Sequence, residues 1–330
     1  MEFFLPFQIQ SYPFTISYHD KILFIGSCFS EEIGNKLKEL KFDILQNPNG
    51  ILYDPLSISD SLFSYIENKP FDEENLFQLN GLWHSWKHHS IFSGTDKKEV
   101  LKKINASQSW THAFLKEANF LIITLGTAFY YQLKDDNKNV ANCHKAPATL
   151  FEKKLMPANE IISEMLSVLT AIKLFNPALK IIFTVSPVKH VRDGVVENNR
   201  SKAHLIEAVH SIAEQKEAIF YFPAYELVTD VLRDYRFYKN DLVHPNETAI
   251  SFVFEKFCDS LLNDEDKKIS EKIRSIINAV NHKPFSKESE AHQKFIASQI
   301  QNIDKIEREY LFVNLSKEKK YFLAQDKSSE

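Results

Sequence analysis

Residues 240–246 carry a pair of side chains that suits acid–base chemistry. Asp241 and His244 lie three residues apart, so a single turn of backbone can point both side chains the same way. The aspartate can then hold one imidazole nitrogen while the other nitrogen accepts a proton from a nucleophile. Pro245 is well placed to open the next helix. An Asp-x-x-His pair by itself also fits a solvated aspartate and a capping histidine, so the interpretation needs a nucleophile elsewhere.

Ser27 and Cys28 are the candidate nucleophiles. They follow Gly26 between an apolar run and a helical pattern, where glycine permits a sharp strand-to-helix turn. The N-terminus of a helix favours an anion, lowers the pKa of a thiol and can hold an oxyanion. The alternative is that Ser27 caps the helix and Cys28 fills space. The Asp241–His244 pair at the other end of the same pattern favours chemistry.

The elements that must position these residues alternate between strands and helices. Apolar runs over residues 22–25, 120–125, 181–185 and 219–222 predict strands that are buried on both faces. Helical spacing of apolar residues follows the first run, and further helices are expected over 161–172, 202–214 and 248–262. This order predicts an α/β fold with a doubly wound parallel sheet between two helical layers. Ligands bind at the carboxyl ends of strands in such sheets, where the candidate nucleophiles lie.

The composition changes near Leu262. Residues 263–268 have the character of a solvated linker, and 269–280 and 291–308 predict two amphipathic helices. Residues 317–330 are charged and predict a frayed tail. The chain is therefore expected to form a catalytic-type domain over 1–262 and a helical appendage with a charged tail over 263–330, which suits packing or dimer formation.

The overall composition limits the partners. The net charge of -4 and pI near 6.3 provide no basic field for nucleic acid. Three widely spaced cysteines without a CxxC pair predict neither a disulfide framework nor a zinc site, and fit a reducing cytosol. No apolar run reaches membrane-spanning length, and the first residues lack the positive charges of a signal peptide. We expect a cytoplasmic protein without a cofactor or metal, of open oligomeric state.

Several motifs resemble one known family. Gly26-Ser27-Cys28-Phe29-Ser30 resembles the GSCFA signature, with Ser30 in place of the final alanine. Residues 47–51, 142–145, 197–202 and 241–245 are similar to other blocks of that family, and together the blocks cover most of 1–262. GSCFA proteins are related to the SGNH (GDSL-type) hydrolases. The resemblance therefore implies a three-layer flavodoxin-like sandwich and ester or acyl-group chemistry on a carbohydrate or lipid substrate.

The resemblance also implies roles for individual residues. Aligned on Gly26, the SGNH nucleophile falls on Cys28, and a shift of one residue gives that role to Ser27. The last block matches Asp241 and His244 as orienter and base. The second block, which supplies an oxyanion glycine, is best matched by Gly50.

The third block departs from the SGNH pattern. It falls on Gly126-Thr127-Ala128-Phe129, so Ala128 occupies the position of the oxyanion asparagine. Asn142 or Asn49 could substitute for it. The loss of one oxyanion donor typically lowers the rate by about 100- to 1,000-fold, so the substitution matters.

Other polar clusters are candidates for substrate binding. Residues 83–90 combine three histidines with two tryptophans, which fits a pocket wall in which Trp stacks on a sugar ring, or an aromatic core with rim histidines. His84 and His88 lie at i and i+4, but no third metal ligand is close in sequence. Residues 192–202 are rich in amides and cations and are expected to form a polar lid. The candidate substrate-binding residues are His84, Trp86, His89, Gly126, His144, Arg192, Asn199 and Arg200.

Three functions fit these observations. The first is a hydrolase or acyltransferase that uses Cys28 or Ser27 with His244 and Asp241. The second is a non-catalytic glycan- or metabolite-binding protein on a degenerate SGNH scaffold, which Ala128 favours. The third is a structural partner that acts through its C-terminal helices.

Overall fold

The central element is a five-stranded parallel sheet. The computed structural model describes residues 6–282, 284 and 289–325. Across the sheet the strands run β10-β9-β5-β1-β2, which is the flavodoxin-like order 2-1-3-4-5 when they are counted along the chain. The strands are β1 (Lys21–Gly26), β2 (Asp43–Gln46), β5 (Phe120–Leu125), β9 (Lys180–Val185) and β10 (Ile219–Tyr221).

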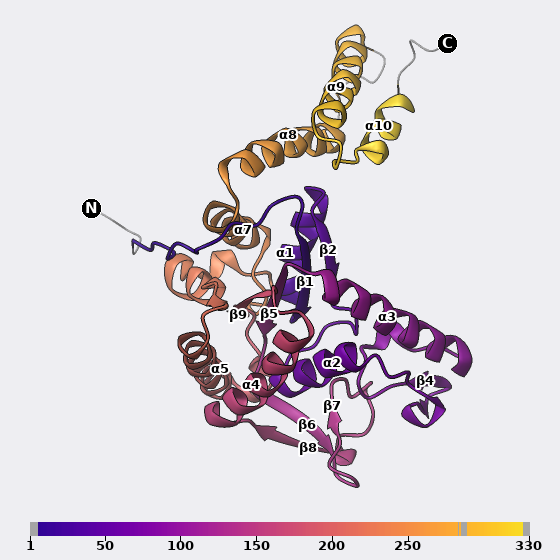
Figure 1. The fold of residues 1–330 in the computed structure, drawn as a ribbon, viewed down its shortest axis with the longest axis vertical. Coiled ribbons are helices and arrows are strands. Elements are labelled where there is room, and N and C mark those ends of the chain that lie inside the picture. Colours follow the sequence, from indigo (N-terminus) through magenta and orange to yellow (C-terminus); the bar gives the residue numbers. More distant parts are fainter. Residues whose placement is uncertain (1–5, 283, 285–288, 326–330) are drawn as a thin grey trace.

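Helices cover both faces of this sheet (Figure 1). Ile22 and Phe24 of β1 pack with the helices of one layer, and Leu23 and Ile25 pack with those of the other. Successive side chains of a strand point to opposite faces, so one apolar strand serves both layers. The first layer holds α1 (Cys28–Glu39) and α7 (Glu247–Leu261), and the second holds α2 (Pro55–Glu67), α3 (Lys97–Glu117), α4 (Ala158–Phe175) and α5 (Val195–Gln215). The predicted three-layer α/β fold is confirmed.

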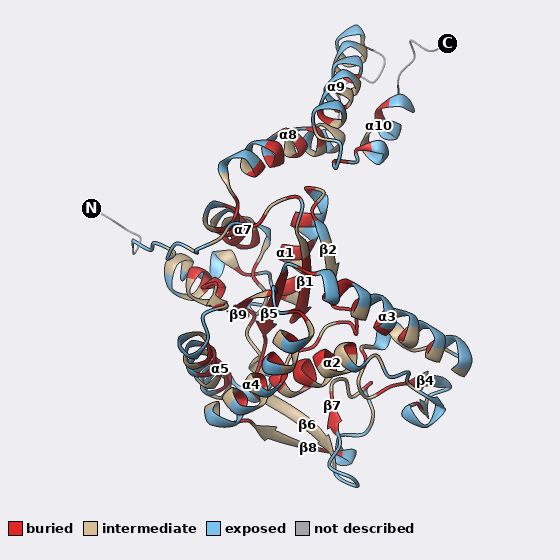
Figure 2. Cartoon of the chain, in the orientation of Figure 1, coloured by how far each residue is buried: buried red, intermediate tan, exposed pale blue. Residues whose placement is uncertain are grey.

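The four predicted strands are present, but shorter strands outside the pattern were missed. β2 is partly exposed and begins and ends with polar residues, so it lacks the apolar run of a buried strand. A separate antiparallel sheet of order β7-β6-β8 lies below the main sheet (Figure 1). Its strands β6 and β8 are half-buried, in contrast to the fully buried β5 (Figure 2). The additional strands are β3 (Phe77–Leu79), β4 (Leu82–His84), β6 (Phe129–Leu133), β7 (Asn139–Val140) and β8 (Phe151–Leu155).

The C-terminal helices begin earlier than the sequence predicts. The expected linker is instead a capped helix start, because the Asn263 side chain accepts the Asp266 N–H at 2.8 Å. Three acidic residues then occupy the first turn, where the helix dipole favours negative charge. Part of the expected frayed tail is also helical, and residues 326–330 lie outside the described residues. The elements are α8 (Asp264–Asn281), α9 (Glu290–Glu309) and α10 (Ser316–Leu323).

The C-terminal helices are joined to the rest of the molecule by a continuous core. Ile273 of α8 and Ile303 of α9 belong to the same buried cluster as Phe257 of α7. In Figure 1, α9 and α10 lie together at the end of the molecule that is far from β6 and β8. In the part of the chain that the structure describes, no helix has the length and apolar content to cross a membrane.

Candidate active site

A cleft of about 440 Å³ opens at the carboxyl edge of the parallel sheet. Its walls come from the segments that follow β1, β2, β5 and β9, from the β6–β8 sheet and from the turn before α7. This is the edge at which open parallel sheets bind ligands. Its polar lining residues are Cys28, Tyr53, Asp54, Thr127, Tyr131, Asn142, Cys143, Lys153, Lys189, His190, Arg192, Asp193 and His244.

Gly26 makes the sharp turn from β1 into α1. Its φ is +134°, and a Cβ at this position would lie 2.1 Å from the carbonyl oxygen of Thr124 on β5. The Gly26 N–H donates to Oδ1 of Asn47 at 2.9 Å, which ties the turn to the loop after β2. Only glycine fits this close approach. The turn therefore places α1 with its first residue, Cys28, at the cleft.

The structure separates the two candidate nucleophiles. Cys28 is half-buried and lines the cleft. Ser27 is fully buried, does not line the cleft, and its Oγ has no hydrogen-bond partner among the described residues. Ser27 occupies the N-cap position without making a side-chain cap bond. Position alone therefore favours Cys28 over Ser27.

The Cys28 thiol is not pre-activated. Burial raises its pKa above that of an ordinary cysteine, and the nearby Glu32 carboxylate raises it further. The backbone N–H groups of Cys28 and Phe29, in the first turn of α1, act in the opposite direction. Because the net shift is upward, thiolate formation requires a base.

A strained turn presents His244. Leu242, between Asp241 and His244, has a φ of +59°, which is costly for a leucine and is typical of turns that a surrounding structure enforces. The Asp241 carboxylate accepts the backbone N–H groups of Val243 at 2.9 Å and His244 at 3.0 Å. Asn246 caps α7, so Pro245 lies one residue outside the cap and does not open the helix as expected.

Asp241 determines which imidazole nitrogen is available. Its Oδ2 lies 2.8 Å from Nδ1 of His244. The backbone N–H groups of His244 and Val243, and then the imidazole, lower the pKa of Asp241 to about 2. The carboxylate is therefore ionised at neutral pH and holds the proton on Nδ1. Nε2 of His244 remains as the proton acceptor.

Cys28 and His244 line the same cleft, but they are not hydrogen-bonded to each other. Within the described residues no hydrogen bond joins His244 to Cys28 or Ser27. Catalytic hydrogen bonds are often long without substrate and tighten when substrate binds. The structure thus places the candidate nucleophile and the candidate base in one cavity, without a hydrogen bond between them.

Lys202 ties together the strand ends beneath the cleft. It is only 1% exposed, and its Nζ donates to the carbonyls of Gly126 and Ser186 at 2.6 Å each. Burial lowers the pKa of Lys202 to about 7, and interaction with Cys28 acts in the opposite direction. Gly126 itself does not line the cleft, so its role is structural rather than substrate-binding.

The expected lid over 192–202 is mostly helix. α5 starts at Val195, so Asn199 and Arg200 point to solvent and lie outside the cleft, and Arg200 pairs with Glu197 at 2.9 Å. The buried side of the same helix holds loops in place: Asn198 Oδ1 accepts the His190 N–H at 2.7 Å. Of the predicted lid residues only Arg192 and Asp193, which precede the helix, reach the cleft.

Of the three predicted oxyanion donors, only Asn142 lines the cleft. The N–H of Gly50 donates to the carbonyl of Asn47 at 2.7 Å, and neither Gly50 nor Asn49 lines the cleft. Asn142 does line it; its Oδ1 accepts the His144 N–H at 2.9 Å, which directs the amide nitrogen elsewhere. Ala128 is fully buried in the core behind the cleft, so an asparagine in its place would not face the cavity.

The histidine and tryptophan cluster packs away from the cleft. His84 bonds Ser93 Oγ at 2.7 Å and His144 bonds the Ser85 carbonyl at 2.8 Å, while His89 caps a short 3-10 helix. Trp86 stacks on Phe77 with a centroid distance of 3.5 Å. These four residues were predicted to bind substrate, but the structure uses the histidines as local supports. No cluster of three or more potential metal-ligating side chains occurs among the described residues.

Sequence reasoning missed several residues of the cleft. Tyr53 lies after β2, and it could have been found by applying the strand-end rule if that polar strand had been recognised. His190 packs edge-on to Tyr53 at 5.3 Å, and burial lowers its pKa to about 3. Cys143 is a second thiol in the cleft, whose pKa burial raises to about 11.

Cations gather at the rim of the cleft. Lys153 pairs with Asp193, whereas Lys189 donates to the Tyr235 hydroxyl at 3.0 Å and has no acidic partner among the described residues. Arg192 also lacks an ion pair in the described part of the chain. The rim is therefore net positive and favours groups that carry or develop negative charge.

The chain thus combines a flavodoxin-like sheet with a thiol at the start of α1 and an aspartate-held histidine before α7. The chain belongs to the GSCFA family, whose profile matches residues 21–257. Residues 273–328 match the GSCFA domain protein, C-terminal domain. No curated protein matches the chain.

Two solved structures are weakly similar. One is an acetyl xylan esterase, Est2A, from the rumen bacterium Butyrivibrio proteoclasticus, with 13% identity and a TM-score of 0.37. The match covers 74% of this chain and 64% of that chain. The other is a carbohydrate esterase family 3 protein from Talaromyces cellulolyticus, with 10% identity, a TM-score of 0.36, and coverage of 78% of this chain and 99% of that chain.

Proposed function

We propose that this protein is an ester hydrolase or acyltransferase in which Cys28 is the nucleophile and His244 the general base. One observation carries the proposal: Cys28, at the first turn of α1, and the Asp241-held His244 line the same cleft at the carboxyl edge of the sheet. Ser27, which is buried beneath the cleft, is not the nucleophile in this proposal.

The first half-reaction forms a thioester. Nε2 of His244 takes the proton from the Cys28 thiol, and the sulfur attacks the acyl carbonyl carbon. The carbonyl oxygen becomes an oxyanion, which the N–H groups of Cys28 and Phe29 and the amide of Asn142 stabilise. The ester C–O bond then breaks, and the leaving alcohol takes the proton from His244. Asp241 stabilises the imidazolium that exists between these proton transfers.

The second half-reaction releases the acyl group. His244 takes a proton from water or from an acceptor alcohol, whose oxygen attacks the thioester carbon. The C–S bond breaks, and the Cys28 sulfur recovers the proton. Water gives hydrolysis, and an alcohol gives acyl transfer. The family relation points to an ester of a carbohydrate or lipid as substrate, and the cationic rim suits the negative charge that develops during the reaction.

The covalent intermediate provides the direct test. Incubation with a small activated acetyl ester should release the alcohol and place an acetyl group on the peptide that contains Cys28, detected by mass spectrometry after acid quench. Cys143, the other thiol of the cleft, is the internal control and should stay unmodified. Acetylation of Ser27, or of both thiols equally, would contradict the assignment of Cys28.

Asn142→Ala tests the oxyanion site. Its amide is the side-chain donor at the cleft that replaces the missing third-block asparagine, so we expect turnover of the acetyl ester to fall by about 100-fold, with a smaller change in KM. Asn49→Ala is the matched control, because Asn49 does not line the cleft. Equal losses in the two variants would indicate that Asn142 acts through folding alone.

A binding protein on the same scaffold is the second candidate. The raised pKa of Cys28 and the lack of a Cys28–His244 hydrogen bond favour it. It predicts no acyl-enzyme and no turnover from the unmutated protein, together with ligand binding that survives His244→Ala.

A further inference from the structure

A second cavity lies behind the cleft, on the other side of β7. It encloses about 370 Å³, within the range of roughly 300–1,000 Å³ that is usual for ligand pockets. Asn139 lines this cavity, whereas the next residue, Val140, lines the cleft. Successive residues of a strand face opposite sides, so β7 forms a shared wall. The two cavities have no lining residue in common.

Hydroxyl groups of α2 form one wall of this second cavity. Ser57, Ser61 and Ser64 repeat at helical spacing, and Asp60 lies on the same face. The facing wall comes from the loop after α2 and the segment after β4, which contribute the aromatic side chains of Phe71 and Trp86. The cavity is thus lined by both polar groups and aromatic carbon.

One buried acceptor in the lining lacks a partner. Asn139 is 7% exposed, and its Nδ2 donates to Oδ2 of Asp60 at 3.1 Å and to Oγ of Ser57 at 3.3 Å. Its Oδ1 has no hydrogen-bond partner among the described residues. An unpaired buried acceptor typically costs about 1–3 kcal/mol. Oδ1 of Asn139 is closed to solvent, so a ligand hydroxyl offsets this cost only after a small shift of the side chain opens the atom to the cavity.

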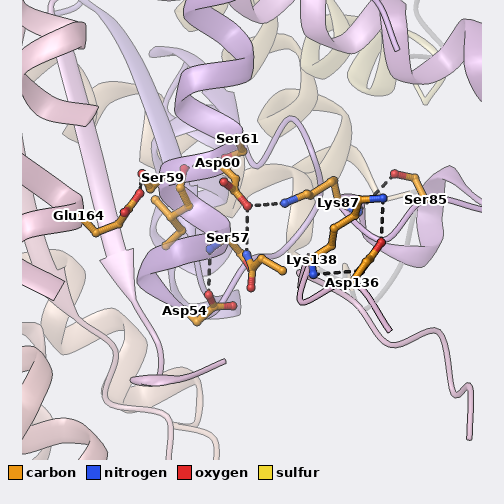
Figure 3. A network of polar contacts seen from close by, with 12 residues as sticks. Asp54, Ser57, Ser59, Asp60, Ser61, Ser85, Lys87, Asp136, Lys138 and Glu164 are labelled. Atoms are coloured by element: carbon orange, nitrogen blue, oxygen red, sulfur yellow. Dashed lines mark hydrogen bonds and ion pairs between the residues drawn. The ribbon is translucent and has the colours of Figure 1, made fainter. Parts of the chain in front are cut away.

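Both lysines of the cavity have acidic partners. Figure 3 shows Lys87 directed at Asp60 on α2, and Lys138 directed at Asp136. The Lys138 Nζ lies 2.8 Å from the Asp136 carboxylate. The lining contains two lysines and two acids, Asp60 and Glu74. Lys87 pairs with Asp60, and Lys138 pairs with Asp136 outside the lining, so Glu74 is left without a cationic partner among the described residues. Within the described residues the cavity therefore offers no free cation for an anionic ligand, and Glu74 adds one carboxylate that can accept hydrogen bonds from ligand hydroxyls.

We propose that the second cavity binds a neutral saccharide. The ring carbons lie against Trp86 and Phe71, and ligand hydroxyls donate to Oδ1 of Asn139 and exchange hydrogen bonds with the serines of α2. Stacking on Phe77 holds Trp86 in place, which lowers the entropy cost of binding. The site is separate from the Cys28 cleft and does not depend on the acyl chemistry proposed there.

Tryptophan fluorescence can test this proposal. We would titrate the full-length protein with cellobiose, xylobiose and N,N′-diacetylchitobiose, and with glucose 6-phosphate as an anionic probe. At least one neutral disaccharide should change the emission saturably. The change should persist in Trp110→Phe, which alters an exposed tryptophan of α3, and in Cys28→Ala, which alters only the other cavity.

Two variants of the second cavity should weaken this binding by about tenfold or more, equivalent to about 1.4 kcal/mol. Asn139→Ala removes the unpaired acceptor, and Ser64→Phe fills the cavity from a half-buried position, so it remains informative if Asn139→Ala does not fold. The proposal is overturned by any of three results: no saturable response to the three disaccharides, unchanged affinity in the folded variants, or loss of the response in Cys28→Ala. Because Cys28→Ala separates the cavities, an inactive protein that binds a disaccharide would still support the proposal.

Discussion

Cys28→Ala is expected to lower the turnover of an activated acetyl ester by at least about 10,000-fold, to a rate close to that without enzyme. The variant removes the atom that we propose forms the thioester, and no other thiol among the described lining residues of the cleft lies at the start of a helix. His244→Ala should cost about 1,000- to 10,000-fold, because the raised pKa of Cys28 leaves little thiolate without a base. Steady-state and burst kinetics measure both effects.

Ser27→Ala and Cys143→Ala are the matched controls for these two variants. Ser27 Oγ is buried without a partner, so its removal should change neither stability nor turnover appreciably. Cys143 lines the same cleft and reports whether any thiol there matters. An active Cys28→Ala protein together with an inactive Ser27→Ala protein would move the nucleophile to Ser27. Loss of activity in all four variants would point to disturbed packing instead.

Lys202→Met should change how stability depends on pH. The pKa of Lys202 is about 7 in the folded protein, against 10.5 for an ordinary lysine, because the side chain is buried. Between these values the unfolded chain binds more protons than the folded one, so the free energy of unfolding rises with pH, by up to about 1.4 kcal/mol per pH unit. Below the folded pKa both states are protonated and the cost of the buried ammonium is fully present. Lys202→Met lacks this contribution and should show a flatter rise.

Urea unfolding at several pH values between about 7 and 8.5 measures how the free energy of unfolding changes with pH. At higher pH the cysteines, whose pKa values are raised in the folded protein, would lower the free energy of unfolding and mask the effect of Lys202. Lys102→Met is the control, since Lys102 is 78% exposed on α3 and should leave the slope unchanged. Lys202→Gln keeps a donor for the Gly126 and Ser186 carbonyls without the titrating group, and should behave as Lys202→Met does. An unchanged slope in both Lys202 variants would show that this lysine remains charged in the folded protein throughout the range.

The sheet was accessible from sequence because buried parallel strands carry a strong local signal. The runs in β1 and β5 are apolar on both faces, and Gly26 marks the turn into α1. β2 and the β6–β8 sheet were missed because their residues are partly exposed and pair with distant segments, so the local pattern is weak. The division of the chain at residue 262 stays a prediction.

Local spacing was sufficient for the parts of the site that one turn can build. Asp241 and His244 are neighbours within a turn, and Cys28 follows a glycine that no other residue can replace. The residues predicted to bind substrate lie outside the Cys28 cleft where the prediction depended on helical phase or on packing between segments. Asn199 faces solvent once α5 is known to begin at Val195, and Trp86 packs on Phe77 beside a different cavity.

The amino-acid sequence thus determined the parallel α/β fold class, the family, and the two segments of the candidate site around Cys28 and His244. Each of these depends on residues close together in the chain. Only the tertiary structure decided which candidate nucleophile faces the cleft, that Asn142 rather than Asn49 or Gly50 reaches it, and that Lys202 joins two strand ends. These features depend on which way a side chain points after distant segments have packed. No pattern of spacing along the chain encodes that direction.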